Sequence, residues 1–307
     1  MKLEASILQQ RMLQQIPSAS GIEYVEGSYY VLGDDSPYLY QLGEAFELKR
    51  KYPLFDTTAF KNGRIPKAEK PDLESMAHFT YGRDNMLLLL GSGSSESRNK
   101  AYWVNLSENM KVREVDFSRF FTFLKSILKI KTEGELNIEG LATDEIYTYL
   151  LHRSIGNKAN VLFRFDTGDF KDYILGNAGL PAAAAYYFML PAVGQNGAGF
   201  SGAYTSEGKL FVTASVEATS NAIDDGEVLG SFIGVIDLLA LPYASDAANP
   251  LQVPAVQLTN TNGSVYKGKA ESLIVTMPEN QNKYKAIIVT DDDKGGSELL
   301  EVELTVE

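Results

Sequence analysis

The sequence predicts an all-β protein, a five-bladed β-propeller that forms one domain over residues 1–307. The main observation is a phrase that recurs five times, in which an oxygen-bearing residue, a small residue and an apolar residue open an apolar stretch. The copies begin at Ser20, Glu74, Glu139, Ser201 and Glu271. Their spacing runs from 54 residues (20 to 74) to 70 residues (201 to 271). Such a period suits one four-stranded blade per unit, with insertions in the loops.

Two further apolar stretches follow each copy of the phrase and predict the second and third strands of every blade. The second stretches begin at Tyr29, Leu87, Tyr147, Leu210 and Ala286, and each ends in polar turn residues. The third stretches begin at Tyr38, Tyr102, Val161, Phe232 and Leu299. Outer strands are expected near 48–53, 112–115, 185–190 and 255–258. Short apolar runs bounded by turn residues are typical of strands.

The fifth unit is one strand short, because the chain ends after its third strand. The stretch Leu3–Leu8 has no unit of its own, and a closed propeller does not leave an edge unpaired. We therefore expect the N-terminal stretch to complete the last blade. A six-bladed alternative stays open if 166–193 contains an extra pair of strands. The spacing of apolar residues in 117–131 predicts a short helix between the second and third blades.

Composition narrows the function classes without selecting one. Hydrophobic residues make up 44% of the chain, with 17 Tyr and 15 Phe, which suits an aromatic-rich β core. The formal charge of −12 argues against a nucleic-acid partner. There is no cysteine, and no stretch reaches the length of a membrane span or a signal peptide. We expect no membrane partner and a cytoplasmic location by default, or a secreted or periplasmic one if a leader has been removed.

The five oxygen-bearing residues form a candidate metal site. In a propeller the first strand of each blade runs along the central channel, so Ser20, Glu74, Glu139, Ser201 and Glu271 should face one another. Three carboxylates in a narrow channel repel, so either their pKa values rise or a cation neutralises them. A roomy ring of oxygen ligands suits Ca²⁺ better than Mg²⁺ or Zn²⁺. The alternative is that these residues line a wet channel without a metal.

A second candidate site is a ligand-binding mouth at one end of the channel. The connections between second and third strands emerge on the same side as the connections between blades. They bring together a set of polar residues, joined by the loop 62–70: Asp34, Asp35, Ser92, His152, Arg153 and Asp291. Carboxylates able to hold a metal or act as bases would face cations able to hold an anionic small molecule. No catalytic residue is assigned, and a protein partner is left open.

The order Ser, Glu, Glu, Ser, Glu resembles that of the calcium-activated nucleotidases, or apyrases. The resemblance implies a five-bladed propeller with an axial calcium held by these residue types. First-blade elements of that family are echoed by Tyr29-Tyr30, Asp34-Asp35 and Tyr40-Gln41, but Ser36 replaces the arginine that follows the paired aspartates. The phrases at 16–21, 90–95 and 136–141 look like an uncharacterised bacterial propeller family that spans nearly the whole chain.

Two function hypotheses follow from these sites. The first is a small-molecule binding or scaffold propeller whose calcium fastens the inner strands together. The second is a calcium-dependent hydrolase of nucleotides or other phosphoesters, with Asp34, Asp35 and Arg153 at the mouth. Ser36 in place of an arginine, and the lack of an evident Ser-His-Asp spacing, favour the first hypothesis.

Overall fold

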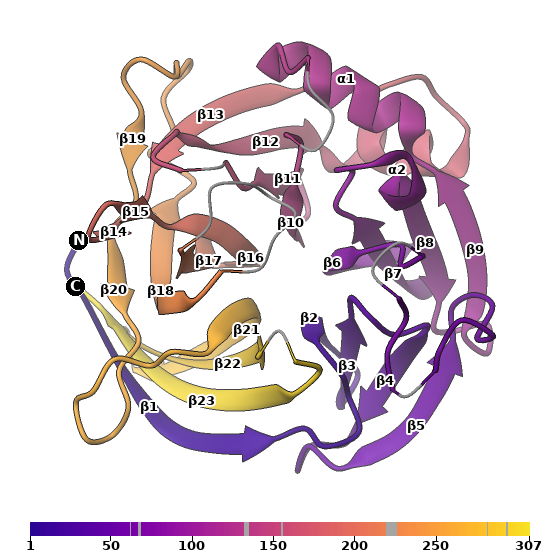
Figure 1. Cartoon of the computed structure of the whole chain (residues 1–307). Coiled ribbons are helices and arrows are strands. Elements are labelled where there is room, and N and C mark those ends of the chain that lie inside the picture. Colours follow the sequence, from indigo (N-terminus) through magenta and orange to yellow (C-terminus); the bar gives the residue numbers. More distant parts are fainter. Residues whose placement is uncertain are drawn as a thin grey trace.

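The computed structural model describes residues 1–61, 63–66, 69–131, 135–154, 156–218, 226–280, 282–292 and 294–307, with the side chains of 277–280 not described. Five small sheets stand in a ring around a central channel (Figure 1). The prediction of an all-β, five-bladed propeller is confirmed. Of the loops expected around the mouth, Asn62, Lys67, Ala68, Ile155, 219–221 and Asp293 lie outside the described residues.

Each of the first four blades is an antiparallel meander that begins on the channel and runs outwards. Blade 1 contains β2 (Ala19–Val25), β3 (Ser28–Gly33), β4 (Tyr38–Leu42) and β5 (Leu48–Pro53). Blade 2 contains β6 (Leu73–Tyr81), β7 (Asp84–Gly91), β8 (Lys100–Asn105) and β9 (Lys111–Asp116). Blade 3 contains β10 (Ile138–Thr143), β11 (Tyr147–His152), β12 (Asn160–Asp166) and β13 (Ala184–Met189), extended by β19 (Leu251–Gln252). Blade 4 contains β16 (Gly199–Ser206), β17 (Lys209–Glu217), β18 (Val228–Asp237) and β20 (Ala255–Gln257).

Blade 5 joins the two ends of the chain, as the sequence predicts. It contains β21 (Lys269–Asn280), β22 (Lys283–Asp291) and β23 (Ser297–Val306), with β1 (Leu3–Met12) as its outer strand. β1 pairs antiparallel with β23 from Leu3↔Val306 to Met12↔Glu298. Ile7 anchors it, since this side chain is 3% exposed in the apolar cluster between blades 4 and 5. The edge of blade 5 is therefore covered.

Two helices occupy the insertions. α1 (Ser118–Leu128) is the predicted helix and buries Phe120, Phe121 and Leu124 in the cluster between blades 2 and 3. The stretch 166–193 adds no blade, because α2 (Thr167–Leu175) lies where extra strands had been considered. Asp166 caps it by accepting a hydrogen bond from the Asp169 N–H, and Gly176 ends it at φ 80°. No described helix could cross a membrane.

The remaining short elements are η1 (Glu96–Arg98) and the hairpin of β14 (Ala192–Val193) with β15 (Asn196–Gly197). The apolar core is divided into five clusters, each between two neighbouring blades. The blades therefore pack face to face through apolar side chains, and polar residues from several blades lie at the central channel.

Candidate functional site

Each of the five oxygen-bearing residues that open the recurring phrase is the extra residue of a β-bulge. The pairing of the inner strand with its neighbour shifts register between 19 and 21, 73 and 75, 138 and 140, 200 and 202, and 270 and 272. The residues skipped are Ser20, Glu74, Glu139, Ser201 and Glu271. A bulge leaves one residue out of the ladder and re-aims its side chain. The recurring phrase therefore encodes a backbone irregularity as well as a side chain.

Close packing requires the glycine that follows three of the bulges. A Cβ added at Gly21 or Gly140 would meet a leucine of the second strand at 2.9 Å. At Gly202 it would lie 2.4 Å from the Glu271 carbonyl oxygen of the next blade. Larger residues at these three positions would push the strands apart, which explains why glycine follows the bulge in blades 1, 3 and 4.

The three glutamates meet on the axis. Glu74, Glu139 and Glu271 come from blades 2, 3 and 5, and each offers a carboxylate oxygen within 4.8 Å of the other two. Ser20 and Ser201 use their hydroxyls differently. Each donates a hydrogen bond to a carbonyl oxygen of the following blade, at Leu73 (2.6 Å) and Ala270 (2.5 Å) respectively. The serines thus link neighbouring blades, and the carboxylates form the centre.

Hydrogen bonds satisfy this centre only in part. Asn137 donates its amide to Glu139 Oε1 at 2.5 Å, and Lys269 lies 3.0 Å from Glu271 Oε1. The second oxygen, Glu271 Oε2, is buried with no hydrogen-bond partner among the described residues, and Glu271 is 3% exposed. Burial, with Asp72 and Glu139 nearby, raises the pKa of Glu74 well above its usual value. The pKa of Glu271 is likewise raised, mainly by burial.

Next to Glu139 and Glu271, blades 3, 4 and 5 share an ion-pair network. Arg153 donates to Glu217 Oε1 at 2.8 Å and lies 4.0 Å from Glu139. Lys269 lies 3.4 Å from Glu217. Although burial opposes ionisation, these two cations lower the pKa of Glu217 to about 2. Gly199 makes room for this arrangement, because a Cβ there would clash with the Arg153 side chain at 2.4 Å.

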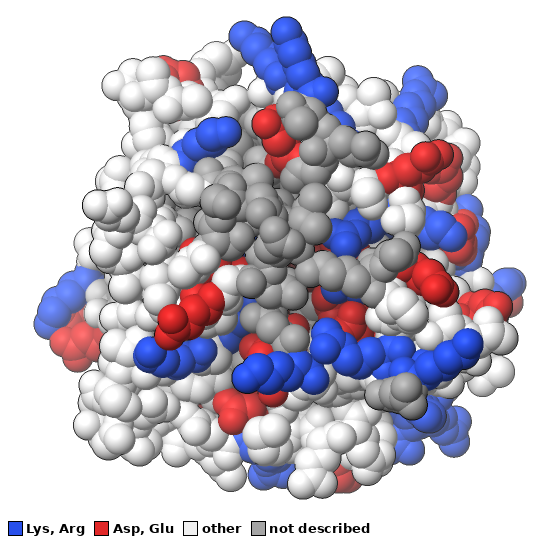
Figure 2. All heavy atoms as spheres, viewed as in Figure 1, with Lys and Arg blue, Asp and Glu red and all other residues white. Residues whose placement is uncertain are grey.

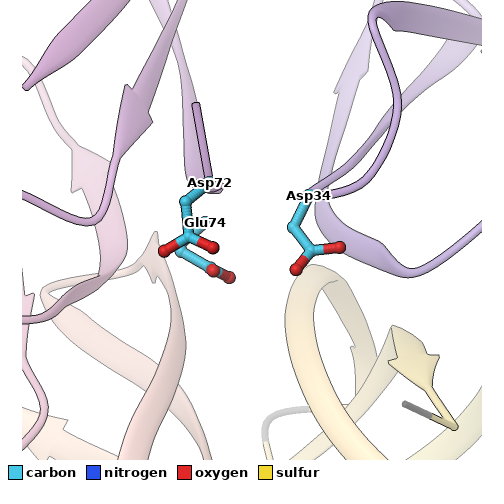
Figure 3. Close-up of side chains that lie close together, drawn as sticks. All are labelled: Asp34, Asp72 and Glu74. Carbon is cyan, nitrogen blue, oxygen red and sulfur yellow. The ribbon is translucent and has the colours of Figure 1, made fainter. Parts of the chain in front are cut away.

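A second network joins blades 1 and 2 around Lys70, whose side chain is 9% exposed. Its ammonium pairs with Asp34 and lies 3.1 Å from Asp72. Figure 3 shows Asp34 facing Asp72 and Glu74, and these three residues offer oxygens within 4.8 Å of one another. Asp72 also accepts a hydrogen bond from Ser92 at 2.6 Å, whereas Arg64 pairs with Asp35 at 2.5 Å. Lys70 therefore already supplies a cation at this second acidic group.

Carboxylates outnumber cations among the described residues around the axis. The described carboxylates in these networks are Asp34, Asp35, Asp72, Glu74, Glu139, Glu217, Glu271 and Asp291, whereas the described cations are Arg64, Lys70, Arg98, Arg153 and Lys269. The described part of these networks thus holds eight carboxylates and five cations. Figure 2 shows acidic and basic side chains side by side around the centre of this face.

Five of the six residues predicted for the mouth lie at one end of the channel, in or beside the two ion-pair networks, and His152 does not. Asp34, Asp35 and Ser92 belong to the Lys70 network, and Arg153 belongs to the Glu217 network. Asp291 is 8% exposed and acts electrostatically on Asp34 and Glu271, which places it at the same end. His152 lies on another side of its strand and lines a separate pocket beside α1.

The most important residues that the sequence analysis did not identify are Asp72 and Lys269, whereas Lys70 and Glu217 belong to loops that were expected at the mouth but were not singled out as site residues. A signal was present, because Asp72 and Lys269 stand two residues before a bulged glutamate, as Asn137 does. In strands, residues two apart share a face. Glu23 on β2 is a further buried acid, 7% exposed, and its carboxylate accepts hydrogen bonds from the N–H groups of Tyr24 and His78.

Comparisons with known proteins give a family and a fold. Residues 15–304 match the profile of a family described as "Family of unknown function (DUF6929)". No curated protein matches the sequence. The glutaminyl cyclase of Myxococcus xanthus is similar in structure, with a TM-score of 0.50 and 12% identity over 100% of this chain and 98% of that one. A thermostable family-43 glycoside hydrolase gives a TM-score of 0.49 and 10% identity, covering 100% of this chain and 94% of that one. At such low identity, likeness to the cyclase indicates the fold alone.

Proposed function

Because the chain belongs to DUF6929, a family of unknown function, we propose a function from the geometry of its axis: the protein is a cation-dependent binding or scaffold propeller that holds Ca²⁺ between Glu74, Glu139 and Glu271. The observation that carries this proposal is the convergence of three carboxylates from three blades, one of which keeps a buried oxygen without a hydrogen-bond partner among the described residues. A cation bound there would fasten the inner strands of blades 2, 3 and 5 to one another.

The donor set favours calcium over other common metals. All three side chains offer oxygen, which hard cations prefer, whereas zinc favours nitrogen and sulfur. The oxygens lie up to 4.8 Å apart. Calcium accepts a flexible shell of oxygens at about 2.3–2.6 Å, with water completing it, whereas magnesium demands a tighter octahedron. The apyrase resemblance implies the same metal.

The hydrolase hypothesis receives less support from the arrangement of the cations. A phosphoester site needs cations that can turn to the substrate. Lys70 pairs with Asp34, Arg153 pairs with Glu217 and Arg98 pairs with Asp72, so a phosphate would have to displace a carboxylate in each case. In contrast, Glu271 Oε2 has no hydrogen-bond partner among the described residues, so a metal that binds this oxygen displaces none of them.

Calorimetric titration of the metal-free protein with calcium tests the proposal. We expect one site, a smaller response to magnesium, and a higher melting temperature in calcium than in chelator. Ligand linkage gives about 2.7 kcal/mol of stabilisation at a free calcium concentration about a hundredfold above the dissociation constant.

Two substitutions locate the site. Glu139→Gln should weaken calcium binding, because it removes a charged ligand while keeping the shape of the side chain. Glu114→Gln is the matched control, since this glutamate is 48% exposed and pairs with Lys100 on the outside of blade 2. Absence of calcium binding, or equal binding by both variants, would rule out the axial site.

A further inference from the structure

A second hollow in the protein lies away from the axis, beside blade 3. It has a volume of about 430 Å³ and opens between the end of α1, the residues that follow β11, and β13. α1 lies along the outer part of this blade (Figure 1). Ligand pockets in proteins typically measure about 300–1,000 Å³. The hollow is therefore large enough for a small organic molecule.

His152 supplies a polar group in this pocket. The side chain is 4% exposed and lines the pocket, whereas the next residue, Arg153, turns to the axial network. His152 Nδ1 lies 3.2 Å from both the N–H and the carbonyl oxygen of Asn137. The Asn137 N–H has no other acceptor among the described residues, whereas that carbonyl is already paired with the Arg153 N–H at 2.9 Å. Because a buried backbone N–H needs an acceptor, we assign Nδ1 as the acceptor of the Asn137 N–H. The ring proton then resides on Nε2.

Nε2–H has no hydrogen-bond partner among the described residues. His152 borders the pocket, so water or a ligand there can accept from this donor. A histidine that is 4% exposed and leaves one donor to a pocket is therefore a candidate ligand contact. The ring is neutral at physiological pH, because burial, with Lys158 nearby, lowers the pKa of His152 to about 4.

The remaining walls indicate the kind of molecule. Lys129 and Lys158 are exposed on the rim and form no ion pair with a described residue, and Glu135 is the one acid among the described lining residues. The walls are otherwise largely apolar, with Leu128, Tyr187 and Met189 among them. Such a site offers a donor, two cations and an apolar surface.

We propose that this pocket binds a small carboxylate with an apolar body. The carboxylate accepts a hydrogen bond from His152 Nε2–H and lies near Lys158, and the apolar body packs on Tyr187 and Met189. This pocket lies apart from the axial glutamates, although Asn137 contacts both His152 and Glu139. Inorganic phosphate, which has no apolar body, would bind more weakly.

The ring signals of histidine in nuclear magnetic resonance spectra test the proposal directly, because the chain contains two histidines. His78 is an internal control: it lies on β6, and its Nε2 is 2.8 Å from Asn85 Oδ1. Acetate, benzoate, octanoate and 3-phenylpropionate serve as probes. At least one of the three carboxylates with an apolar body should shift the His152 signals and leave those of His78 in place. The uncharged amide of that carboxylate should bind about tenfold or more weakly, since the charge-assisted hydrogen bond is lost.

Variants identify the pocket as the place of binding. Met189→Trp should fill it and reduce affinity at least about tenfold, and Lys158→Ala should reduce affinity by up to about fivefold, as for an exposed ion pair. Lys111→Ala, an exposed lysine on β9, is the matched control and should bind normally. Unchanged His78 signals show that each variant is folded. Failure of all four probes to shift His152, or full binding by a folded Met189→Trp variant, would overturn the proposal.

Discussion

Replacing Glu23 by glutamine should stabilise the protein at alkaline pH. At mildly acidic pH the same substitution should change the free energy of unfolding very little. Glu23 is buried on the inner strand of blade 1 and accepts hydrogen bonds from the N–H groups of Tyr24 at 3.1 Å and His78 at 3.0 Å. Burial raises the pKa of Glu23 to about 7, although these two donors oppose the rise. Its charge also contributes, after burial, to raising the pKa of Tyr204 on β16 to about 12.

The sign and size of the effect follow from proton linkage. Between the unfolded pKa of 4.5 and the folded pKa of about 7, the folded state binds more protons than the unfolded state. Stability therefore falls as pH rises through this window. A difference of about 2.5 units corresponds to about 3 kcal/mol, of which about 2.5 kcal/mol is lost between about pH 5 and pH 8. Glutamine has no such loss, but it gives up one hydrogen bond, worth about 1 kcal/mol.

Urea unfolding of both proteins across this pH range is the assay. The difference in unfolding free energy between the variant and the parent should increase by about 2.5 kcal/mol from about pH 5 to pH 8, because groups common to both proteins cancel. Glu108→Gln, an exposed control at 60% exposure, should show a flat difference. A flat difference for Glu23→Gln as well would refute the reasoning, since Glu23 would then ionise equally in both states.

Two further substitutions test the closure of the ring and the charge balance of the mouth. Ile7→Ala should cost about 2–5 kcal/mol in urea unfolding, whereas its neighbour Leu8, 58% exposed, should tolerate alanine within about 0.5 kcal/mol. Equal effects would mean that β1 does not cover the edge of blade 5. Above about pH 8, Lys70→Met should cost about 3–5 kcal/mol without metal, because it leaves Asp34 as an uncompensated buried charge; at lower pH the cost is smaller, since burial already raises the pKa of Asp34 to about 7 and the carboxyl takes up a proton. Calcium should restore part of this loss; a variant as stable as the exposed-site control Lys100→Met in chelator would contradict that account.

Much of the fold could be predicted because the sequence repeats its inner strands in phase. The missing strand of unit five and the unassigned stretch 3–8 predicted the closure that β1 and β23 form. α2 was missed because its nine residues are short for a helical pattern. Its signals are local ones, a capping Asp166, a terminal Gly176, and buried Phe170 and Ile174 one turn apart. These helix signals do not resemble the alternation of apolar and polar residues that indicates a strand.

The candidate site was predictable only where it follows the repeat. Glu139 and its counterparts occupy equivalent bulges, so phase alone placed them on the axis. The behaviour of Ser20 depends on a carbonyl of the neighbouring blade, and that of Lys70 depends on how an interblade loop folds over the channel. His152 was grouped with Arg153 because they are neighbours in sequence, but adjacent strand residues point to opposite sides.

The pairing of β1 with β23 also sets the order in which the molecule can be completed. The two strands are separated by nearly the whole chain, so at about 5–20 residues per second the ribosome makes β23 roughly 15–60 s after β1. During that interval β1 has no partner. Blades 1 to 4 are synthesised one after another and form an open arc whose terminal sheet edges are exposed. Unpaired edges invite pairing with other chains. The outer edge of blade 5 is thus the last to be covered, and β1 of a neighbouring copy fits the same edge by strand exchange.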